Sequence, residues 1–256
     1  MTKTLLAGAA LLILLPAHAD ISVTSTSFTY SQSFDSLATT GTANAWTNDV
    51  TLAGWSLLTS TNAAVATYRA DNGTSNAGAV YSYGTTSATE RALGSVGSSG
   101  FPGGYIAVAF TNNTGATLDS LTLGFSGEQW RNGGAATPVA QTMALEYGFG
   151  ASFAGVTWAA PGGAFNFTSP VVAVTGAAVD GNGAGLIAGL GGTVTTPWAA
   201  GDTLWVRWIE VNDAGSDHGL AIDNFALSVS AVPEPEAWTL MLAGVAALGF
   251  IAHRRG

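Results

Sequence analysis

Apolar and polar side chains alternate along most of the chain between Asp20 and Ala231. A period of two is typical of a β-strand that buries one face, and short Gly-, Asn- and Thr-rich turns separate these segments. No stretch of this region shows a long 3.6-residue repeat bounded by helix caps. The pattern predicts an all-β domain, an antiparallel β-sandwich of jelly-roll-like form. The clearest predicted strands cover residues 105–110, 118–125, 142–147, 203–209 and 220–227.

Tryptophan is frequent in this region, and most of these rings should fill the core, because no disulfide supports the fold. In the predicted strand 203–209, Trp205 and Trp208 fall on opposite faces. We therefore expect at least one of the two rings near the surface.

The N-terminus has the order of a secretory signal peptide. Lys3 precedes an apolar run from Leu5 to Leu15, and an Ala-His-Ala cleavage site ends at Ala19. We predict that residues 1–19 are removed and that one β-sandwich domain covers residues 20–231.

The C-terminus contains three unlike parts in a fixed order. A proline-rich stem is followed by an uncharged apolar run over residues 237–252 and by Arg254 and Arg255. As a helix the 16 apolar residues would span roughly 24 Å, a short but feasible membrane crossing if its flanks snorkel. The arginines predict a cytoplasmic end, so the β-domain would lie outside the inner membrane.

This tail resembles the PEP-CTERM sorting signal of Gram-negative bacteria. The matching parts are Pro233-Glu234-Pro235, the apolar stretch and the terminal Arg254-Arg255. The resemblance implies recognition and cleavage near the stem by an exosortase, a membrane-embedded cysteine transpeptidase. It also implies an inner-membrane-anchored intermediate that passes to the cell surface or extracellular matrix. The proline-rich stem is held extended, where an enzyme can bind it.

The composition limits the partners of the domain. The chain has no cysteine, and residues 20–231 hold fourteen acids against four arginines and no lysine. Without cysteine there is neither a disulfide framework nor thiol catalysis. Without a basic footprint, nucleic acid is a poor partner, whereas a cation or a neutral sugar suits the surface.

The segment from Glu128 through Gln129 and Trp130 to Arg131 is the candidate ligand site. A carboxylate, an amide, an indole and a guanidinium together supply the apolar face and polar groups that a sugar requires. A structural alternative stays open, in which Glu128 forms an ion pair with Arg91 or Arg131.

Acids near the end of the domain suggest bound calcium. Asp213, Asp217 and Asp223 lie close in sequence, and hard oxygen ligands suit Ca²⁺. Resemblance to jelly-roll sugar-binding modules, in which a structural calcium links the first and last strands, pairs Asp35 with Asp223. In the alternative interpretation these residues only form turns, as expected for Asp180-Gly181-Asn182-Gly183.

Catalytic groups are sparse. His218 is the one histidine between Asp20 and Ala231, and its triad partners would be Asp217 or Asp223, but no G-x-S-x-G motif is present. Two of Glu128, Glu146 and Glu210 would form a glycosidase pair if their carboxylates lay roughly 5–10 Å apart. We therefore expect a protein that is not an enzyme.

Further segments resemble a domain that recurs in exported PEP-CTERM proteins and beside some secreted nucleases. The resemblance adds an expectation of fold and no defined chemistry. We expect an exported envelope or matrix protein, with binding of exopolysaccharide as one role. The alternatives are a glycosidase or esterase acting on exopolysaccharide, and a structural matrix protein without ligand. The matching segments are Phe34–Leu37, Tyr81–Gly84, Glu90–Ser95, Gly127–Arg131 and Asp217–Phe225.

Overall fold

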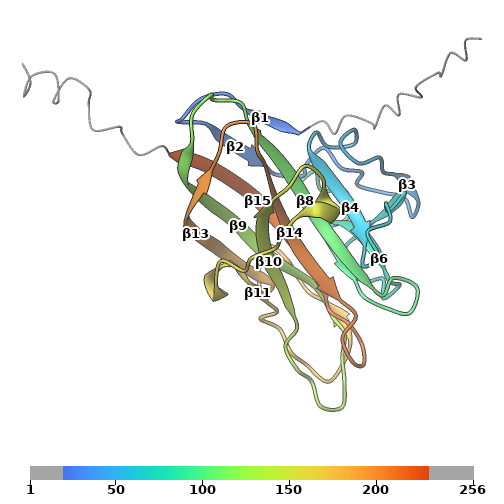
Figure 1. The fold of residues 1–256 in the computed structure, drawn as a ribbon. Coiled ribbons are helices and arrows are strands. Elements are labelled where there is room, and N and C mark those ends of the chain that lie inside the picture. The colour runs from blue at the N-terminus through green and yellow to red at the C-terminus, as the bar shows by residue number, and fades with distance from the viewer. Residues whose placement is uncertain (1–19, 231–256) are drawn as a thin grey trace, which may run out of the picture.

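The computed structural model describes residues 20–230, which are almost entirely β-structure (Figure 1). The predicted all-β class is confirmed. Within this range the only helical segments are two single 3₁₀ turns, η1 (Phe153–Gly155) and η2 (Gly163–Phe165). No helix among residues 20–230 is long and apolar enough to cross a membrane. The predicted signal peptide and C-terminal transmembrane helix lie outside the described residues.

The strands form two sheets. The six-stranded sheet has the order β1-β8-β14-β10-β11, and β4 also pairs with β8. It contains β1 (Ile21–Val23), β4 (Trp55–Thr59), β8 (Gly103–Asn112), β10 (Thr142–Phe149), β11 (Phe167–Thr168) and β14 (Thr203–Val211).

The nine-stranded sheet has the order β12-β9-β15-β7-β6-β5-β3, while β13 also pairs with β9 and β2 with β15. From β7 to β10 and from β13 to β15, each successive long strand changes sheet. The nine-stranded sheet contains β2 (Thr29–Gln32), β3 (Asn44–Ala45), β5 (Thr67–Asp71), β6 (Ala79–Tyr83), β7 (Ala92–Val96), β9 (Leu118–Asn132), β12 (Ala177–Ala178), β13 (Leu186–Trp198) and β15 (Gly219–Ser230).

All five strands predicted from alternation are present, within β8, β9, β10, β14 and β15. Their pairings with one another are antiparallel, as expected. Two pairings depart from the prediction, because β1 runs parallel to β8 and β5 parallel to β6. In both pairs one member is short, β1 with three residues and β5 with five.

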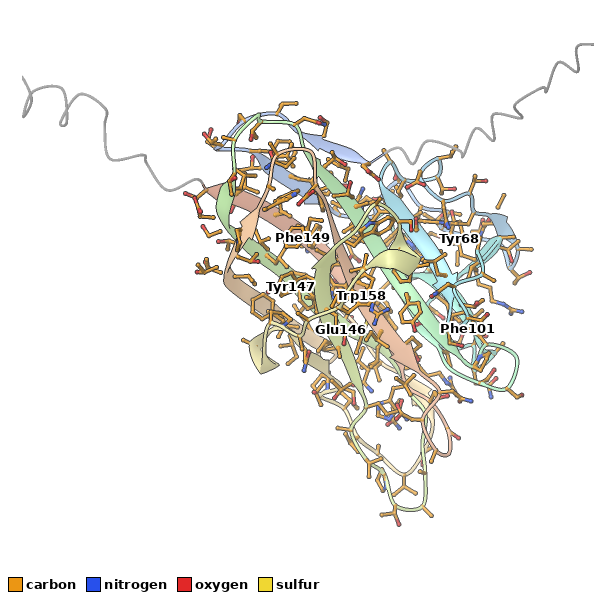
Figure 2. All side chains as sticks on the ribbon, viewed as in Figure 1. Tyr68, Phe101, Glu146, Tyr147, Phe149 and Trp158 are labelled. Atoms are coloured by element: carbon orange, nitrogen blue, oxygen red, sulfur yellow. The ribbon has the colours of Figure 1, made fainter. Side chains whose placement is uncertain are left out.

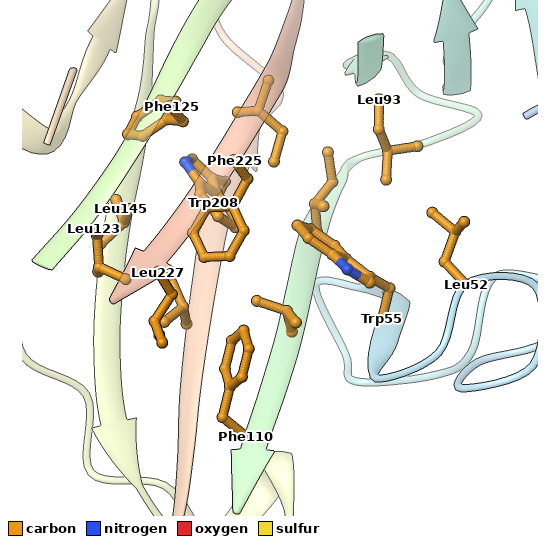
Figure 3. Close-up of a cluster of buried hydrophobic side chains, with 14 of the residues drawn as sticks. Leu52, Trp55, Leu93, Phe110, Leu123, Phe125, Leu145, Trp208, Phe225 and Leu227 are labelled. Atoms are coloured by element: carbon orange, nitrogen blue, oxygen red, sulfur yellow. The ribbon is translucent and has the colours of Figure 1, made fainter. Parts of the chain in front are cut away.

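The main core lies between the two sheets (Figure 3). The Trp208 indole from β14 stacks near-parallel on Trp55 from β4, with centroids 6.0 Å apart. Both rings meet Phe225 of β15 edge-on, so aromatic contacts join the sheets. Edge-to-face pairs of this kind contribute about 0.5–1.5 kcal/mol each beyond their burial.

Each sheet also buries a smaller apolar cluster on its outer face. Tyr81, Tyr83 and Trp130 gather outside the nine-stranded sheet, and Phe153 and Trp205 gather outside the six-stranded sheet. The expectation that Trp205 or Trp208 lies near the surface is therefore wrong, since both are buried. Alternation placed them on opposite faces correctly, but the segment around η1 covers the outer one.

Candidate functional sites

Three carboxylates from different parts of the chain converge on the outer face of the nine-stranded sheet. Glu90, Glu128 and Asp223 each place one carboxylate oxygen so that the three oxygens lie within 4.8 Å of one another. We call these three residues the carboxylate cluster.

Strand pairing explains this convergence. On β15, Ala221 pairs with Glu128 of β9 and Ile222 pairs with Leu93 of β7. Asp223 points to the outer face because its neighbour Ile222 fills the inner core, and Glu128 does so because it pairs with Ala221 of the outer cluster. Glu90 lies two residues before β7 begins. The pairing of β9, β15 and β7 thus brings two strand residues and one residue just before a strand together.

The cluster receives little compensation from the rest of the protein. The Trp130 indole donates to Glu128 Oε2 at 2.8 Å, the Asn224 amide donates to Asp223 Oδ2 at 2.6 Å, and Asn182 donates to Glu90 Oε2 at 2.5 Å. Glu90 Oε1 and Asp223 Oδ1 are buried and have no hydrogen-bond partner among residues 20–230.

Burial shifts the acidity of the two more enclosed members of the cluster. Loss of water raises the pKa of Glu128 to about 8, and the hydrogen bond from Trp130 offsets part of this rise. Burial likewise raises the pKa of Asp223 to about 7, and the nearby charges of Glu90 and Asp35 add to the effect. Both shifts have the direction expected for acids held in a poorly solvated, negatively charged place.

The proposed ion pair of Glu128 with Arg91 or Arg131 is absent from the described part of the chain. The Arg91 guanidinium bonds to the hydroxyl and carbonyl of Ser82, and its burial lowers the pKa of this group. Arg131 donates instead to the carbonyls of Gly73 and Thr74, at 3.1 and 3.0 Å. Both arginines are therefore used to hold loops and strands in place.

The four residues of the predicted sugar site do not share one surface. Glu128 and Trp130 lie on the outer face, where the indole is 1% exposed and stacks on Tyr83 with centroids 6.0 Å apart. A Cβ at Gly181 would lie 2.3 Å from the Trp130 ring, so the 180–185 turn covers the ring closely. Gln129 points the other way and bonds with Val171 and His218. The indole therefore offers no free face to a sugar.

The calcium candidates separate into two groups. Asp223 belongs to the carboxylate cluster, and Asp35 lies close enough to raise its pKa. Asp35 itself is exposed and accepts the Arg91 backbone N–H at 3.0 Å. Two buried oxygens of the carboxylate cluster, Glu90 Oε1 and Asp223 Oδ1, lack partners among residues 20–230, whereas Asp35 adds no oxygen to the cluster. Sequence reasoning missed Glu90 as a member of this cluster, since Glu128 and Asp223 follow it by 38 and 133 residues and only strand order brings the three together.

Asp213 and Asp217 lie instead at a polar pocket of about 360 Å³ at one end of the sheets. Asp217 Oδ1 accepts the Asp213 backbone N–H at 2.8 Å, and burial raises the pKa of Asp217 to about 6. Arg131, Asn76 and Asn212 also line this pocket, so one sugar-site candidate and two calcium candidates meet here.

The catalytic candidates do not assemble. His218 is buried, its Nδ1 lies 3.2 Å from Gln129 Nε2, and burial lowers its pKa. Asp217 accepts a hydrogen bond from the Asp213 backbone N–H, and Asp223 accepts one from the Asn224 side-chain amide, so neither bond orients His218.

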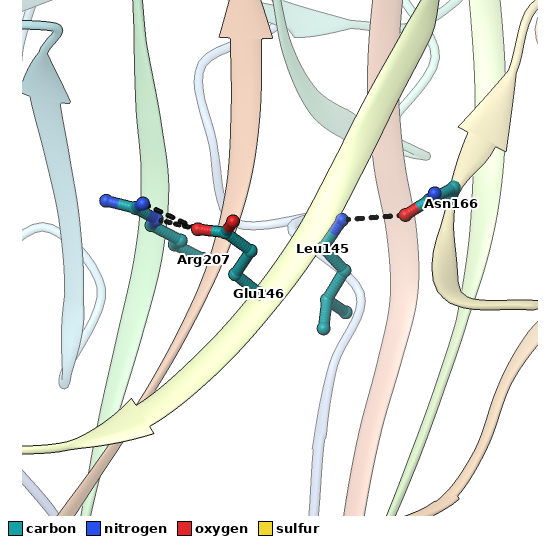
Figure 4. Close-up of polar contacts among 4 residues, drawn as sticks. All are labelled: Leu145, Glu146, Asn166 and Arg207. Carbon is teal, nitrogen blue, oxygen red and sulfur yellow. Dashed lines mark hydrogen bonds and ion pairs between the residues drawn. The ribbon is translucent and has the colours of Figure 1, made fainter. Parts of the chain in front are cut away.

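The three glutamates are spread over separate layers. Glu128 lies outside the nine-stranded sheet, and Glu146 lies outside the six-stranded sheet, where it pairs with Arg207 (Figure 4). Glu210 is buried, which raises its pKa strongly. It lies on the same face of β14 as the core residues Val206 and Trp208, so it points between the sheets. No two of them share one face.

Comparison with known families gives a match for the C-terminal tail. Residues 231–255 match the family described as the PEP-CTERM protein-sorting motif. The chain is thus similar at its C-terminus to exported proteins that an exosortase sorts, and the motif implies export and a membrane-anchored sorting signal. No curated protein matches the chain.

Proposed function

We propose that this protein is an envelope or matrix component of a Gram-negative bacterium, cut by an exosortase and released to the cell surface or extracellular matrix. The match over residues 231–255 carries the proposal. The folded β-domain ends with β15 at Ser230, three residues before Pro233. The stem therefore follows the last strand directly, with the apolar segment and the two arginines behind it.

The test is a pair of substitutions in the full chain, Glu234→Ala with Pro235→Ala, expressed in a host that has an exosortase. We expect the variant to accumulate at the larger, uncut size in the inner-membrane fraction. Glu236→Ala, one residue beyond the Pro-Glu-Pro stem, is the matched control and should mature normally. A doubly substituted protein of mature size and normal location would reject the proposal.

Polysaccharide binding is the second candidate role, and the polar pocket is the observation that favours it. Its lining combines two carboxylates, a guanidinium and two amides, the donors and acceptors that pair with sugar hydroxyls. Substituting the exposed Asn76 and Asn212 by alanine should weaken binding of the host's own exopolysaccharide about tenfold, without unfolding the domain. Asp202→Asn, in the turn before β14, is the control. If the native protein, the doubly substituted variant and Asp202→Asn bound the polysaccharide equally, or if none of them bound it, the pocket would not have this role.

A binding or structural module is favoured over a glycosidase or esterase, because the glutamates that would act as a pair lie in different layers. Hydrolysis requires two carboxylates on either side of one bond.

The strand order also supports a jelly roll. Four successive strands run β7-β15-β9-β13 in one sheet and β8-β14-β10-β11 in the other, which fits two interlocked Greek keys.

A further inference from the structure

The carboxylate cluster has the properties of a cation site. We propose that Glu90, Glu128 and Asp223 bind one Ca²⁺ ion on the outer face of the nine-stranded sheet. This inference stands apart from export and sorting, because it rests only on the β-domain.

The spacing of the oxygens fits such an ion. Calcium lies about 2.3–2.6 Å from its oxygen ligands, so it contacts oxygens separated by up to about 5 Å. One oxygen from each of Glu90, Glu128 and Asp223 lies within 4.8 Å of the other two. A single ion between the three carboxylates therefore reaches all of them without movement of the strands.

Unsatisfied oxygens give a second, independent reason. The Asp223 side chain is 3% exposed, and its Oδ1 has no hydrogen-bond partner among the described residues. Oε1 of Glu90 is buried and unpartnered in the same way. Leaving a buried acceptor unsatisfied is costly, and a cation removes the cost for both oxygens together with the mutual repulsion.

The donor set selects the type of metal. The three ligand atoms are carboxylate oxygens, which suit Ca²⁺, whereas Zn²⁺ is usually bound through histidine or cysteine. Glu90 is partly exposed and leaves a route from solvent, and water can complete a coordination of six to eight oxygens. Mg²⁺ should bind more weakly, because it requires shorter, near-octahedral contacts.

A bound ion would act as a local clamp. The pairing of β15 with β9 is interrupted between Asp223 and Ala226, and Asn224 there has a positive φ of 51°. The ion would join β9, β15 and the start of β7 across this irregularity. It would also hold the 180–185 turn through Asn182, which already donates to Glu90.

The first test is thermal unfolding of the full chain, purified in detergent and stripped with EDTA. Adding CaCl₂ to about 100 times the dissociation constant should raise Tm by roughly 5–10 °C, and MgCl₂ should raise it less. Modules of this kind outside the cell bind Ca²⁺ with constants of about 10⁻⁴–10⁻³ M, so 10 mM is sufficient at the stronger end.

Asp223→Asn and Glu128→Gln should each lose most of this shift. Both variants should stay folded without calcium, because each replaces a buried carboxyl group by a neutral amide of nearly the same shape. Asp202→Asn removes one exposed acid elsewhere and should keep the full shift. No shift in the native protein, or an unchanged shift in both cluster variants, would overturn the proposal.

The second test locates the ion with Tb³⁺, a luminescent substitute for Ca²⁺. The Trp130 indole donates to Glu128, so it lies close enough to transfer excitation to an ion in the cluster. We expect Tb³⁺ emission that excess Ca²⁺ displaces, that Asp223→Asn abolishes and that Trp130→Phe reduces. Emission that is unaffected by Asp223→Asn and Trp130→Phe would place the ion elsewhere and contradict the site.

Discussion

Each of the two outer faces of the protein holds a glutamate near a tryptophan, but only one of these glutamates pairs with an arginine. Outside the nine-stranded sheet, Glu128 accepts a hydrogen bond from Trp130 within an apolar cluster. Outside the six-stranded sheet, Arg207 pairs with Glu146 and lies over the ring of Trp158. Figure 2 labels Glu146 and Trp158 on that side of the protein. The Arg207 guanidinium carbon lies 3.9 Å from the centre of the Trp158 ring and 4.5 Å from that of Tyr105.

The difference lies in where the compensating charge comes from. Arg207 donates from Nε and Nη2 to Oε2 of Glu146, so that face balances its own charges. Glu128 has two further carboxylates as neighbours, and burial raises its pKa to about 8. A buried acid without a cationic partner either takes up a proton or binds a cation from outside. One face supplies the cation that compensates its acid, whereas the carboxylates of the other face have no ion pair among residues 20–230.

The largest effect is expected from Trp130→Ala. This change removes a fully buried ring, its stacking on Tyr83 and the donor to Glu128, and should lower the free energy of unfolding by about 3–5 kcal/mol. Trp158→Ala on the opposite face should cost only about 1–2 kcal/mol, because that ring is half-buried. Urea denaturation of both variants measures the contrast, and equal losses would contradict it.

Arg207→Met should have the next largest effect. The methionine keeps the apolar stem packed but removes the ion pair and the contacts with Tyr105 and Trp158, at a cost of about 1–3 kcal/mol. Arg207→Lys restores the charge without the planar group and should recover part of the loss. If Arg207→Met were as stable as the native protein in urea, the ion pair with Glu146 and the ring contacts of Arg207 would contribute nothing to stability.

The pH dependence of a third acid extends the contrast to the polar pocket. Burial raises the pKa of Asp217 from about 4 to about 6. The stability that the protonated side chain contributes is complete below its pKa in the unfolded state. It is lost as the pH rises through its pKa in the folded state. Asp217→Asn does not ionise and so lacks this loss. Between pH 4 and pH 7 its free energy of unfolding should rise by about 1–2 kcal/mol relative to that of the native protein. The figure is below the full linkage value because solvent reaches the pocket.

Urea titrations at pH 4, 5.5 and 7 measure this gain, with the exposed Asp202→Asn as control. Parallel stability profiles for the native protein and Asp217→Asn would show that Asp217 ionises as freely in the folded state as in the unfolded state.

The smallest effect is expected from Glu146→Gln. The amide oxygen still accepts a hydrogen bond from Arg207, and the lost charge is 25% exposed on the glutamate side. The free energy of unfolding should fall by up to about 1 kcal/mol, and the difference should shrink as salt is added. A loss that is large or independent of salt would show that the pair is shielded from solvent.

Several elements of the fold follow from local pattern. Alternation over residues 203–209 predicts β14 and assigns Trp205 and Trp208 to opposite faces, as found. Local pattern does not reveal that the η1 segment folds back over Trp205. Covering loops are recruited by tertiary contact, and their sequences carry no period that predicts the target.

The candidate sites are less predictable for a related reason. The sequence names Glu128, Asp223, Asp213 and Asp217 as candidates, because their chemistry is visible in the residue type. It does not indicate that Glu128 and Trp130 share a face that is closed, or that Arg131 belongs with Asp213 and Asp217 at another pocket. The spatial neighbours of a side chain on a strand depend on which strands pair with it and in which register.

The sequence alone determines the β-class of this protein and its sorting tail, because both depend on short-range features: a two-residue period, and an ordered stem, apolar run and basic end. Only the tertiary structure decides that Glu90 joins Glu128 and Asp223 while Glu146 joins Arg207. Strand order is a long-range property, and it determines which charges become neighbours and which of them remain without a partner.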